Sequence, residues 1–452
     1  MRSYEYFEEK KTALKKQVEA AAVSGEVLGL AKKTSNLFRY RSEENKKKLS
    51  VDEFSGVLAI DADAGVADVL GMTTYEDFVE ETVKAGFMPA VVPELKTITV
   101  GGAITGVGIE ASSFKFGLVH ESMRELEVIL PDGRIVIATA DNEFRDLFFG
   151  FPNSYGTLGY ILRVKVDVIK IKPFVRVEHT PFSTPEEFFS VLNNTCLEAR
   201  LSSSYDFIEG VMFSESEFVL SKAVFTENAP YTSNYKFMKK YFESLKKEQV
   251  DFLSVKDFIW RWDTDWFWCS KHFGMYNKVL RFLFGKFMLR SSVYWKLRNF
   301  SHKSKVFRYV SSLSKKKTES VVQDVEIPVQ NATQFVKFFN KEIGILPVWI
   351  CPTMARSTHT KFDLYMMDPL TLYINFGFWD VVPTKEADGF FNRKIEKKVR
   401  ELNGKKSLYS TSFYEEDEFW QLYNKEKYDV LKFLYDPEGR TKNLYEKCVL
   451  RR

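Results

Sequence analysis

The segment from Pro93 to Gly117 constrains the fold of this chain more than any other segment. Within eight residues it contains four glycines, Gly101, Gly102, Gly106 and Gly108. Glycine lets the backbone approach a ligand closely and adopt positive φ, so the amides of such a loop can converge on an anion. The same composition also suits a tight packing loop. Glycine content alone leaves both interpretations open.

Two well-known phosphate-binding motifs do not match this segment. No GKS or GKT follows the glycines, so the segment is not a P-loop. A dinucleotide fingerprint of the GxGxxG type should connect a strand directly to a crossover helix. Here we expect the glycines to lie between a strand and a further polar loop, which excludes that motif as well.

The segments around the glycines predict an alternation of strands and helices. Residues 1–24 indicate a charged helix, and the turn from Asp61 to Ala64 indicates a β-hairpin. Asp132 and Gly133 form a strong two-residue hairpin signal between ELEVIL and RIVIAT. MPAVVP and the segment from Tyr160 read as strands. Up to about residue 175 the pattern is typical of an α+β domain with strands in two groups.

One amphipathic helix is predicted in detail, beginning at Thr74. Thr74 is a suitable N-cap, and Asp77 three residues later completes a capping box. Gly86 suits the left-handed position that closes a helix. The positions of one helical face are Tyr75, Phe78, Val79, Thr82 and Val83.

The length of 452 residues suits two or three domains. From 176 to 425, helical stretches such as TPEEFFSVLNN alternate with strands such as EFVLSKAVF, which predicts a second domain. The last segment, 426–452, reads as helical. We therefore expect an N-terminal helix (1–24), a first domain (25–175), a second domain (176–425) and a C-terminal segment (426–452).

Composition excludes several functional classes. The net charge of +4 is low for a protein that binds DNA or RNA along its length. The four cysteines form no CxxC pair, and the histidines show no metal-ligand spacing, so we expect no metal site and a reducing compartment. The N-terminus lacks the apolar core of a secretory signal, and no run of apolar residues is long enough to span a membrane. We expect a cytoplasmic protein, attached at most to a membrane surface.

Three separated motifs occur together in a known order. They are TVGGAITGVGIEASSFKFG, VILPDGRIV and DLFFGFPNSYGTLGY. From about residue 20 to 175 the chain resembles the FAD-binding domain of the PCMH-type (vanillyl-alcohol oxidase) flavoproteins. Within that superfamily it most resembles the Δ24-sterol reductases (the Diminuto/seladin group). FIEGVMFSESEFVLS, YNKVLRFLFGKF, LPVWICP and FYEEDEFWQLY extend this resemblance through most of the chain.

The resemblance implies an α+β fold in which a two-subdomain FAD-binding domain carries an inserted substrate (cap) domain, and the C-terminal segment returns to the FAD domain. The first loop contains no histidine for covalent attachment, so we expect FAD to be held non-covalently. The positions expected to hold FAD are Lys33, Thr34, Ser35, Asn36, Pro93, Thr99, Gly101, Gly102, Ala103, Thr105, Gly106, Ser112, Ser113, Gly156, Thr157 and Gly159.

A flavin carries out the hydride transfer, and the protein positions it and excludes water. Reduction of a carbon–carbon double bond also needs a proton donor, whereas oxidation of an alcohol needs a base. Our candidates for these roles are Tyr373, Tyr409, Tyr445 and Lys447. Both residue types have ordinary pKa values near 10 and would need tuning. For any single tyrosine, a half-buried structural residue is the more common alternative, because the chain has many tyrosines.

Residues 278–317 contain twelve Lys or Arg, no Asp or Glu, and many aromatic residues. Such a segment suits docking on an anionic membrane surface. Single-stranded nucleic acid is an alternative, disfavoured here because no nucleic-acid fold motif accompanies it. The solvated face of two helices is the other alternative.

Together these features predict an FAD-dependent oxidoreductase that reduces a C=C bond of a sterol or isoprenoid-like lipid. NAD(P)H as the electron donor is implied by the resemblance alone. One alternative is an oxidase or dehydrogenase acting on the C–OH of a sugar, polyol or lipid-linked sugar. The non-enzymatic alternative is a flavin-less protein that binds lipid or a partner.

Overall fold

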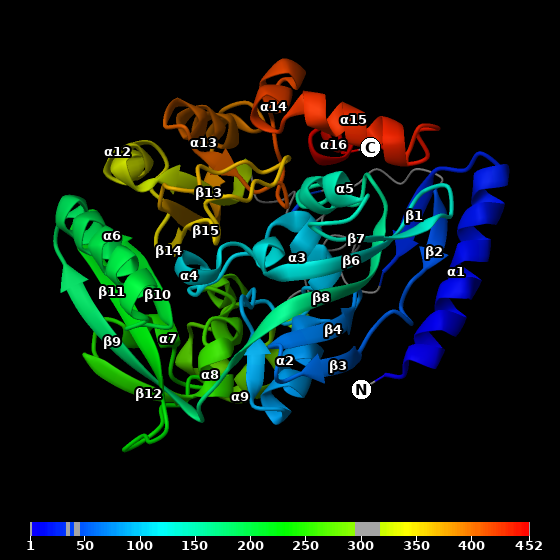
Figure 1. Ribbon diagram of the computed structural model, residues 1–452. Coiled ribbons are helices and arrows are strands. Elements are labelled where there is room, and N and C mark those ends of the chain that lie inside the picture. Colours follow the sequence, from blue (N-terminus) through cyan, green and yellow to red (C-terminus); the bar gives the residue numbers. More distant parts are fainter. Residues whose placement is uncertain (1, 33–36, 40–45, 294–316, 452) are drawn as a thin grey trace.

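The computed structural model describes residues 2–32, 37–39, 46–293 and 317–451. Two large antiparallel sheets organise this part of the chain, one from each half, and Figure 1 shows them side by side with the C-terminal helices above. The α+β class predicted from the sequence is confirmed.

The first sheet belongs to the N-terminal half and has the order β3-β4-β8-β6-β7, with β5 also paired to β8. Helices α2 and α3 cover one face, and α1 covers the other. Two short parallel strands, β1 and β2, lie beside α1 (Figure 1). The bounds of these elements are α1 (Tyr4–Val23), β1 (Leu28–Ala31), β2 (Lys47–Ser50), β3 (Val57–Asp61), β4 (Val66–Leu70), α2 (Tyr75–Lys84), β5 (Phe87–Pro89), α3 (Val100–Gly106), α4 (Ser113–Phe116), η1 (Val119–Ser122), β6 (Met123–Ile129), β7 (Ile135–Ala138), α5 (Arg145–Gly150) and β8 (Tyr160–Lys170).

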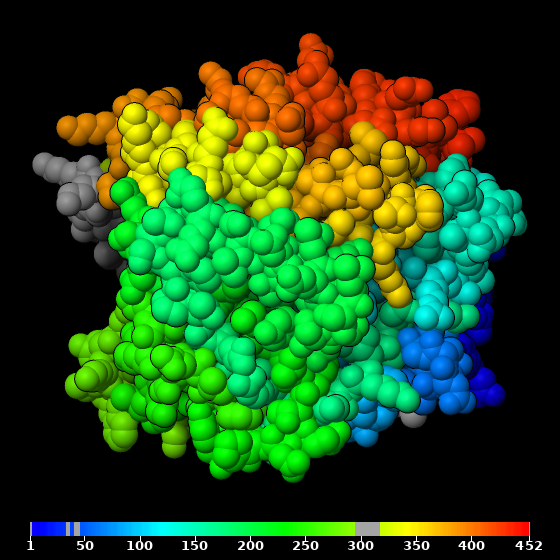
Figure 2. All heavy atoms as spheres, turned by 60° about the vertical axis from the view of Figure 1, so that its left-hand side comes forward, coloured from blue at the N-terminus to red at the C-terminus, as the bar shows by residue number. Residues whose placement is uncertain are grey.

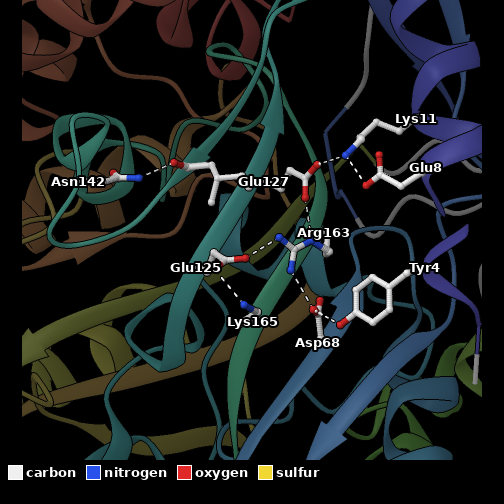
Figure 3. Close-up of polar contacts among 10 residues, drawn as sticks. Tyr4, Glu8, Lys11, Asp68, Glu125, Glu127, Asn142, Arg163 and Lys165 are labelled. Carbon is white, nitrogen blue, oxygen red and sulfur yellow. Dashed lines mark hydrogen bonds and ion pairs between the residues drawn. The ribbon is translucent and has the colours of Figure 1, made fainter.

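Helix α1 is fixed to its sheet by charge as well as by apolar packing. Arg163 of β8 lies beneath the helix and bonds to Asp68 at 2.8 Å and Glu127 at 2.7 Å (Figure 3). From α1, the hydroxyl of Tyr4 donates to Asp68 at 2.7 Å, and Lys11 Nζ lies 2.9 Å from Glu127. The helix therefore covers a set of buried charges that it also helps to neutralise.

The second sheet has the order β12-β9-β11-β10-β14-β15-β13-β16, and all its pairs are antiparallel. Helices α6, α12 and α13 cover its outer face. This part of the chain, green and yellow in Figure 2, forms most of the surface turned forward there. Its elements are β9 (Phe174–Phe182), α6 (Pro185–Ser202), β10 (Phe207–Ser214), β11 (Glu217–Thr226), α7 (Tyr241–Ser244), β12 (Val250–Ser254), α8 (Val255–Ile259), η2 (Asp263–Asp265), η3 (Cys269–Phe273), α9 (Lys278–Met288), β13 (Thr318–Pro328), α12 (Val329–Glu342), β14 (Val348–Thr353), β15 (Tyr373–Pro383), α13 (Phe390–Glu401) and β16 (Lys405–Lys406).

The last helices return to the N-terminal half. They are α14 (Glu416–Leu422), α15 (Lys425–Tyr435) and α16 (Leu444–Cys448). Lys432 Nζ of α15 donates to the carbonyl of Thr157 at 2.9 Å, and Leu431 packs against Gly150 of α5. We propose a domain division near residue 175, where the chain passes from β8 in one sheet to β9 in the other, with residues 426–452 as the returning segment.

Several local predictions are confirmed. The hydroxyl of Thr74 accepts from the amide of Asp77, and α2 buries Tyr75 and Phe78. Gly86 has φ +81°, the left-handed conformation expected after the helix. The hairpin around residues 61–64 forms between β3 and β4.

Three local predictions were wrong. The hairpin between β6 and β7 does not have a two-residue turn, because the amide of Leu130 donates to the carbonyl of Arg134 and encloses residues 131–133. The strand expected at MPAVVP reduces to β5, which ends at Pro89. The glycine segment is a short helix, α3, where an open loop was expected.

Candidate active site

A cavity of about 1480 Å³ lies between the two halves of the chain. Its walls come from α3 and the start of β8 on one side and from the inner face of β13, β14 and β15 on the other. Sites for a single small molecule usually have about 300–1,000 Å³. This cavity therefore has room for a large ligand together with a second one.

The glycine wall is built by close packing of α3. Thr99 caps the helix by accepting from the amide of Gly102 at 3.2 Å. The amide of Gly101 donates to the carbonyl of Gly71 at 2.9 Å, and a Cβ on Gly101 would lie only 2.8 Å from that oxygen. The amides of these two glycines thus donate hydrogen bonds to oxygens of the protein itself. They do not converge on a phosphate, which was one of the two interpretations of the glycine segment. What the glycines provide is a wall without side chains.

Most of the positions expected to hold FAD lie at this cavity. Those that line it are Pro93, Thr99, Gly101, Gly102, Ala103, Thr105, Gly106, Gly156 and Gly159. Lys33, Thr34, Ser35 and Asn36 lie outside the described residues.

Three of the expected positions do not line the cavity. Their hydroxyls form buried hydrogen bonds with the protein backbone. Ser112 Oγ donates to the carbonyl of Ala90 at 2.7 Å, and Thr157 Oγ1 donates to that of Ser154 at 2.8 Å. Ser113 Oγ accepts from a backbone amide at 3.1 Å. These residues shape the loops behind the wall.

Arg39 also lines the cavity, although no sequence motif pointed to it. It is 6% exposed, and its guanidinium lies 4.8 Å from the ring centroid of Tyr155. Nη1 donates to the carbonyl of Leu408. Nε and Nη2 are buried and have no hydrogen-bond partner among the residues that the structure describes. Unpaired donors on a buried cation are costly, so this side chain suits an anionic ligand.

Two carboxyl groups project from β13 into the cavity. Asp324 and Glu326 alternate with Val325 and Ile327, which pack beneath the outer helices, so both acids lie on the inner face of the sheet. Asp324 Oδ1 accepts from the side-chain amide of Asn375 at 2.9 Å. Burial raises the pKa of Asp324 to about 6. The acid therefore ionises close to neutral pH.

Glu326 is the more strongly perturbed of the two acids. Its carboxyl accepts a hydrogen bond from the hydroxyl of Tyr365. Burial raises the pKa of Glu326 to about 8, and the nearby charge of Asp324 acts in the same direction. At pH 7 this carboxyl is therefore mostly protonated. It is a buried acid that can give up a proton to a ligand in the cavity.

The four catalytic candidates from the sequence divide into two pairs. Tyr409 and Lys447 line the cavity, and Lys447 Nζ lies 3.4 Å from the carbonyl of Gly156. Tyr373 and Tyr445 do not line it. The hydroxyl of Tyr373 accepts from a backbone amide at 3.0 Å, and that of Tyr445 donates to a carbonyl at 3.3 Å.

Aromatic rings close the remaining wall. Phe267 lies with its ring centroid 4.7 Å from Trp379 and 5.3 Å from Trp349, and Trp266 also lines the cavity. Trp349 Nε1 donates to Glu209 at 2.9 Å. The indole N–H groups of Trp349 and Trp379 are directed to protein partners, and the faces of the rings offer an extended apolar surface.

A buried ion network joins the two halves behind this wall. Arg261 is 1% exposed and bonds to Glu209 of β10 at 2.8 Å. From the N-terminal half, Glu94 lies 2.9 Å and Glu110 2.8 Å from the same guanidinium. Burial raises the pKa of Glu94 and that of Glu110. One arginine therefore holds carboxyls from both walls of the cavity in place.

Comparison with known proteins assigns the cofactor. Residues 9–139 match the model of a family described as an FAD binding domain. Over 410 residues the chain is 26% identical to a human Delta(24)-sterol reductase, which covers 86% of this chain and 75% of the relative. An Arabidopsis thaliana protein of the same name is 25% identical over 441 residues, 88% of this chain and 76% of that protein.

The chain is a flavoprotein with a PCMH-type FAD-binding domain. It is an FAD-dependent oxidoreductase, so the alternative of a flavin-less binding protein loses its support. A cytokinin dehydrogenase from Oryza sativa subsp. indica is 28% identical over 158 residues, which are 35% of this chain and 29% of that protein. This similarity therefore covers a smaller part of the chain than the similarity to the sterol reductases.

The cavity fits FAD on two observations. Gly101, Gly102 and Gly106 leave backbone without side chains at three positions of its wall, and Arg39 contributes buried donors that lack partners among the described residues. Arg39 would hold a phosphate of the cofactor, and the glycine wall would lie against it. When bound, FAD supplies the hydride-transfer chemistry.

The residues that sequence reasoning missed are Arg39, Asp324, Glu326 and the aromatic wall. Asp324 and Glu326 do have a sequence signal, since polar and apolar residues alternate through TESVVQDVEIP. That alternation does not say which face meets a ligand. Arg39 lies in a polar stretch with no motif of its own.

Proposed function

We propose that this flavoprotein reduces a carbon–carbon double bond of a sterol or a similar isoprenoid lipid, with NAD(P)H as the electron donor. The observation that carries the proposal is that one cavity is lined by an aromatic wall and by Glu326, a buried carboxyl whose pKa is raised to about 8. The likeness to Delta(24)-sterol reductases over most of the chain supports the choice of substrate class.

Reduction of a C=C bond adds a hydride to one carbon and a proton to the other. Glu326 holds a proton at its carboxyl and is our proposed donor. As the new C–H bond forms, the O–H bond breaks and the electron pair stays on the carboxylate. The hydroxyl of Tyr365 donates to that carboxylate and stabilises the charge it acquires.

The aromatic wall orients a hydrocarbon substrate and excludes water. Trp266, Phe267 and Trp349 present apolar surface, which contributes about 25 cal/mol for each Å² removed from water. We assign Lys447 and the glycine wall to the part of the cavity that FAD would occupy. Tyr409 acts as a positioning residue for Asp324.

One observation favours the second candidate, oxidation of a sugar or polyol C–OH. Asp324 has a pKa of about 6 and is mostly ionised at pH 7, so it is able to accept a hydroxyl proton. The aromatic wall favours the reductase, because a sugar needs polar partners along its length.

We further propose that FAD is bound without a covalent link and that the protein works in a reducing compartment such as the cytoplasm. Within the described residues no histidine lines the cavity. The four cysteines lie in the described residues, where all are buried and no disulfide joins them. Among the helices the structure describes, none is both long enough and apolar enough to cross a bilayer.

The test is anaerobic spectroscopy of the purified protein. Three results together support the proposal. Acid precipitation releases the flavin, NADPH bleaches it, and a sterol with a side-chain double bond reoxidises it. In D2O the saturated product then carries deuterium at the carbon that the exchangeable acid protonates. Flavin that ignores NADPH but is bleached by a polyol favours the second candidate.

A further inference from the structure

Helix α9 (Lys278–Met288) exposes an apolar face. A surface helix normally presents polar residues to solvent and apolar ones to the core. In α9, Phe282 is 65% exposed and Phe287 is 77% exposed. Their exposed apolar neighbours on this helix are Val279, Leu280, Leu283 and Phe284.

The opposite side of α9 is anchored to the protein by a buried charge. Arg281 is 2% exposed, and its Nη1 lies 2.9 Å from Asp265 Oδ1. Its Nε donates to the carbonyl of Phe237. Gly285 is buried one turn later and packs against the ring of Phe237. The ion pair fixes the rotation of the helix, so the apolar side chains are held outward.

The exposed charges of residues 278–293 have one sign. Lys278, Lys286 and Arg290 are exposed, and no acidic residue occurs between positions 278 and 293. A second copy of the chain docking through the same face would bring these cations together. An anionic partner would neutralise them.

We propose that α9 docks the protein peripherally on an anionic lipid bilayer. The apolar side chains enter the interface between headgroups and acyl chains, and the flanking cations contact the lipid phosphates and carboxylates. Asp265, the anchor of α9, directly precedes Trp266 of the cavity wall, so the docking helix is attached to the substrate side of the site. Membrane docking rests on α9 alone and does not depend on which substrate is reduced.

The test is sedimentation of the FAD-loaded full chain with phosphatidylcholine vesicles, with and without phosphatidylserine. We expect binding that needs phosphatidylserine and weakens with salt. The double variant Phe282→Ser/Phe287→Ser should bind at least about tenfold more weakly, because two large apolar side chains no longer enter the bilayer. Lys278→Glu/Lys286→Glu should remove the preference for anionic vesicles.

The matched control is Phe433→Ser. Phe433 is 74% exposed on α15, where acidic and basic residues alternate. It should leave vesicle binding unchanged. Flavin content and the thermal unfolding midpoint verify that each variant is folded.

Three results would overturn the proposal. The first is a wild-type protein that sediments with neither kind of vesicle, and the second is binding that survives both α9 variants. The third is self-association in solution that the Phe282→Ser/Phe287→Ser variant abolishes, which would make the face an interface between copies. Reduction of the flavin by NADPH without vesicles tests the proposed reaction separately.

Discussion

The hydroxyl of Tyr409 donates a hydrogen bond to Oδ2 of Asp324 over 2.7 Å. The same hydroxyl accepts from Trp379 Nε1 at 3.0 Å, so a single group connects the acid to the aromatic wall. Burial raises the pKa of Tyr409 well above its ordinary value, which makes it a poor base at neutral pH. Tyr409 therefore holds Asp324 in place beside Glu326, the other acid of β13.

Replacing Glu326 with Gln should separate the two halves of the reaction. Glutamine keeps the shape but has no carboxyl proton, so reduction of the lipid should slow by about 10²–10⁴-fold. Reduction of the flavin by NADPH should be unchanged. Stopped-flow measurement of each half-reaction checks this, and an equal loss in both would show that Glu326 is not the proton donor.

The pH dependence of lipid reduction follows from the raised pKa of Glu326. The reactive form is the protonated acid, which is lost as pH rises through about 8. The rate of the lipid half-reaction should therefore fall above pH 8 and lose about tenfold for each further unit. A rate that stays level from pH 7 to 10 would contradict the assignment.

Arg39→Met should weaken FAD binding. Two charge-assisted hydrogen bonds to a phosphate contribute about 1.5–3 kcal/mol each, so the dissociation constant should rise at least about 100-fold. The apoprotein should be no less stable, because the variant removes a buried cation with unpaired nitrogens. Flavin titration and thermal unfolding of the apoprotein give the two readouts.

Arg39→Lys is the matched control, because it keeps the charge and loses the planar donor array. It should retain an intermediate affinity. Unaltered FAD affinity in Arg39→Met would place the phosphates elsewhere.

Tyr409→Phe should act through Asp324. Loss of a hydrogen bond to the carboxylate raises the pKa of Asp324 further above 6. Loss of the acceptor for Trp379 should lower the free energy of unfolding by about 1–3 kcal/mol. NMR titration of the Asp324 carboxyl and urea unfolding measure these effects, and an unchanged pKa of Asp324 would argue against a positioning role.

Arg163→Met should destabilise the N-terminal half. It leaves Asp68, Glu125 and Glu127 close together beneath α1 without the cation they share (Figure 3). The expected loss in the free energy of unfolding is about 3–5 kcal/mol. Lys165→Met, which removes a more exposed cation of the same cluster, should cost about 1 kcal/mol or less. Urea unfolding of both variants makes the comparison.

Interactions between near neighbours in the chain could be predicted. The cap of α2 needs only Thr74 and Asp77, and both are visible in the sequence. The glycine segment marked the cavity wall correctly, because Gly101, Gly102 and Gly106 all line it. Its conformation was missed because α3 is held by contacts with Gly71 and Ile161, which are distant in sequence.

The sequence by itself determined the cofactor family, the α+β class and the local caps, since each depends on motifs or on residues a few positions apart. Tertiary structure alone decided the chemistry of the site. The pKa of Glu326 depends on burial between two halves of the chain, and the unpaired nitrogens of Arg39 depend on what surrounds them. The apolar face of α9 points outward because Arg281 pairs with Asp265. Burial and pairing between distant segments exist only after folding, so no local pattern encodes them.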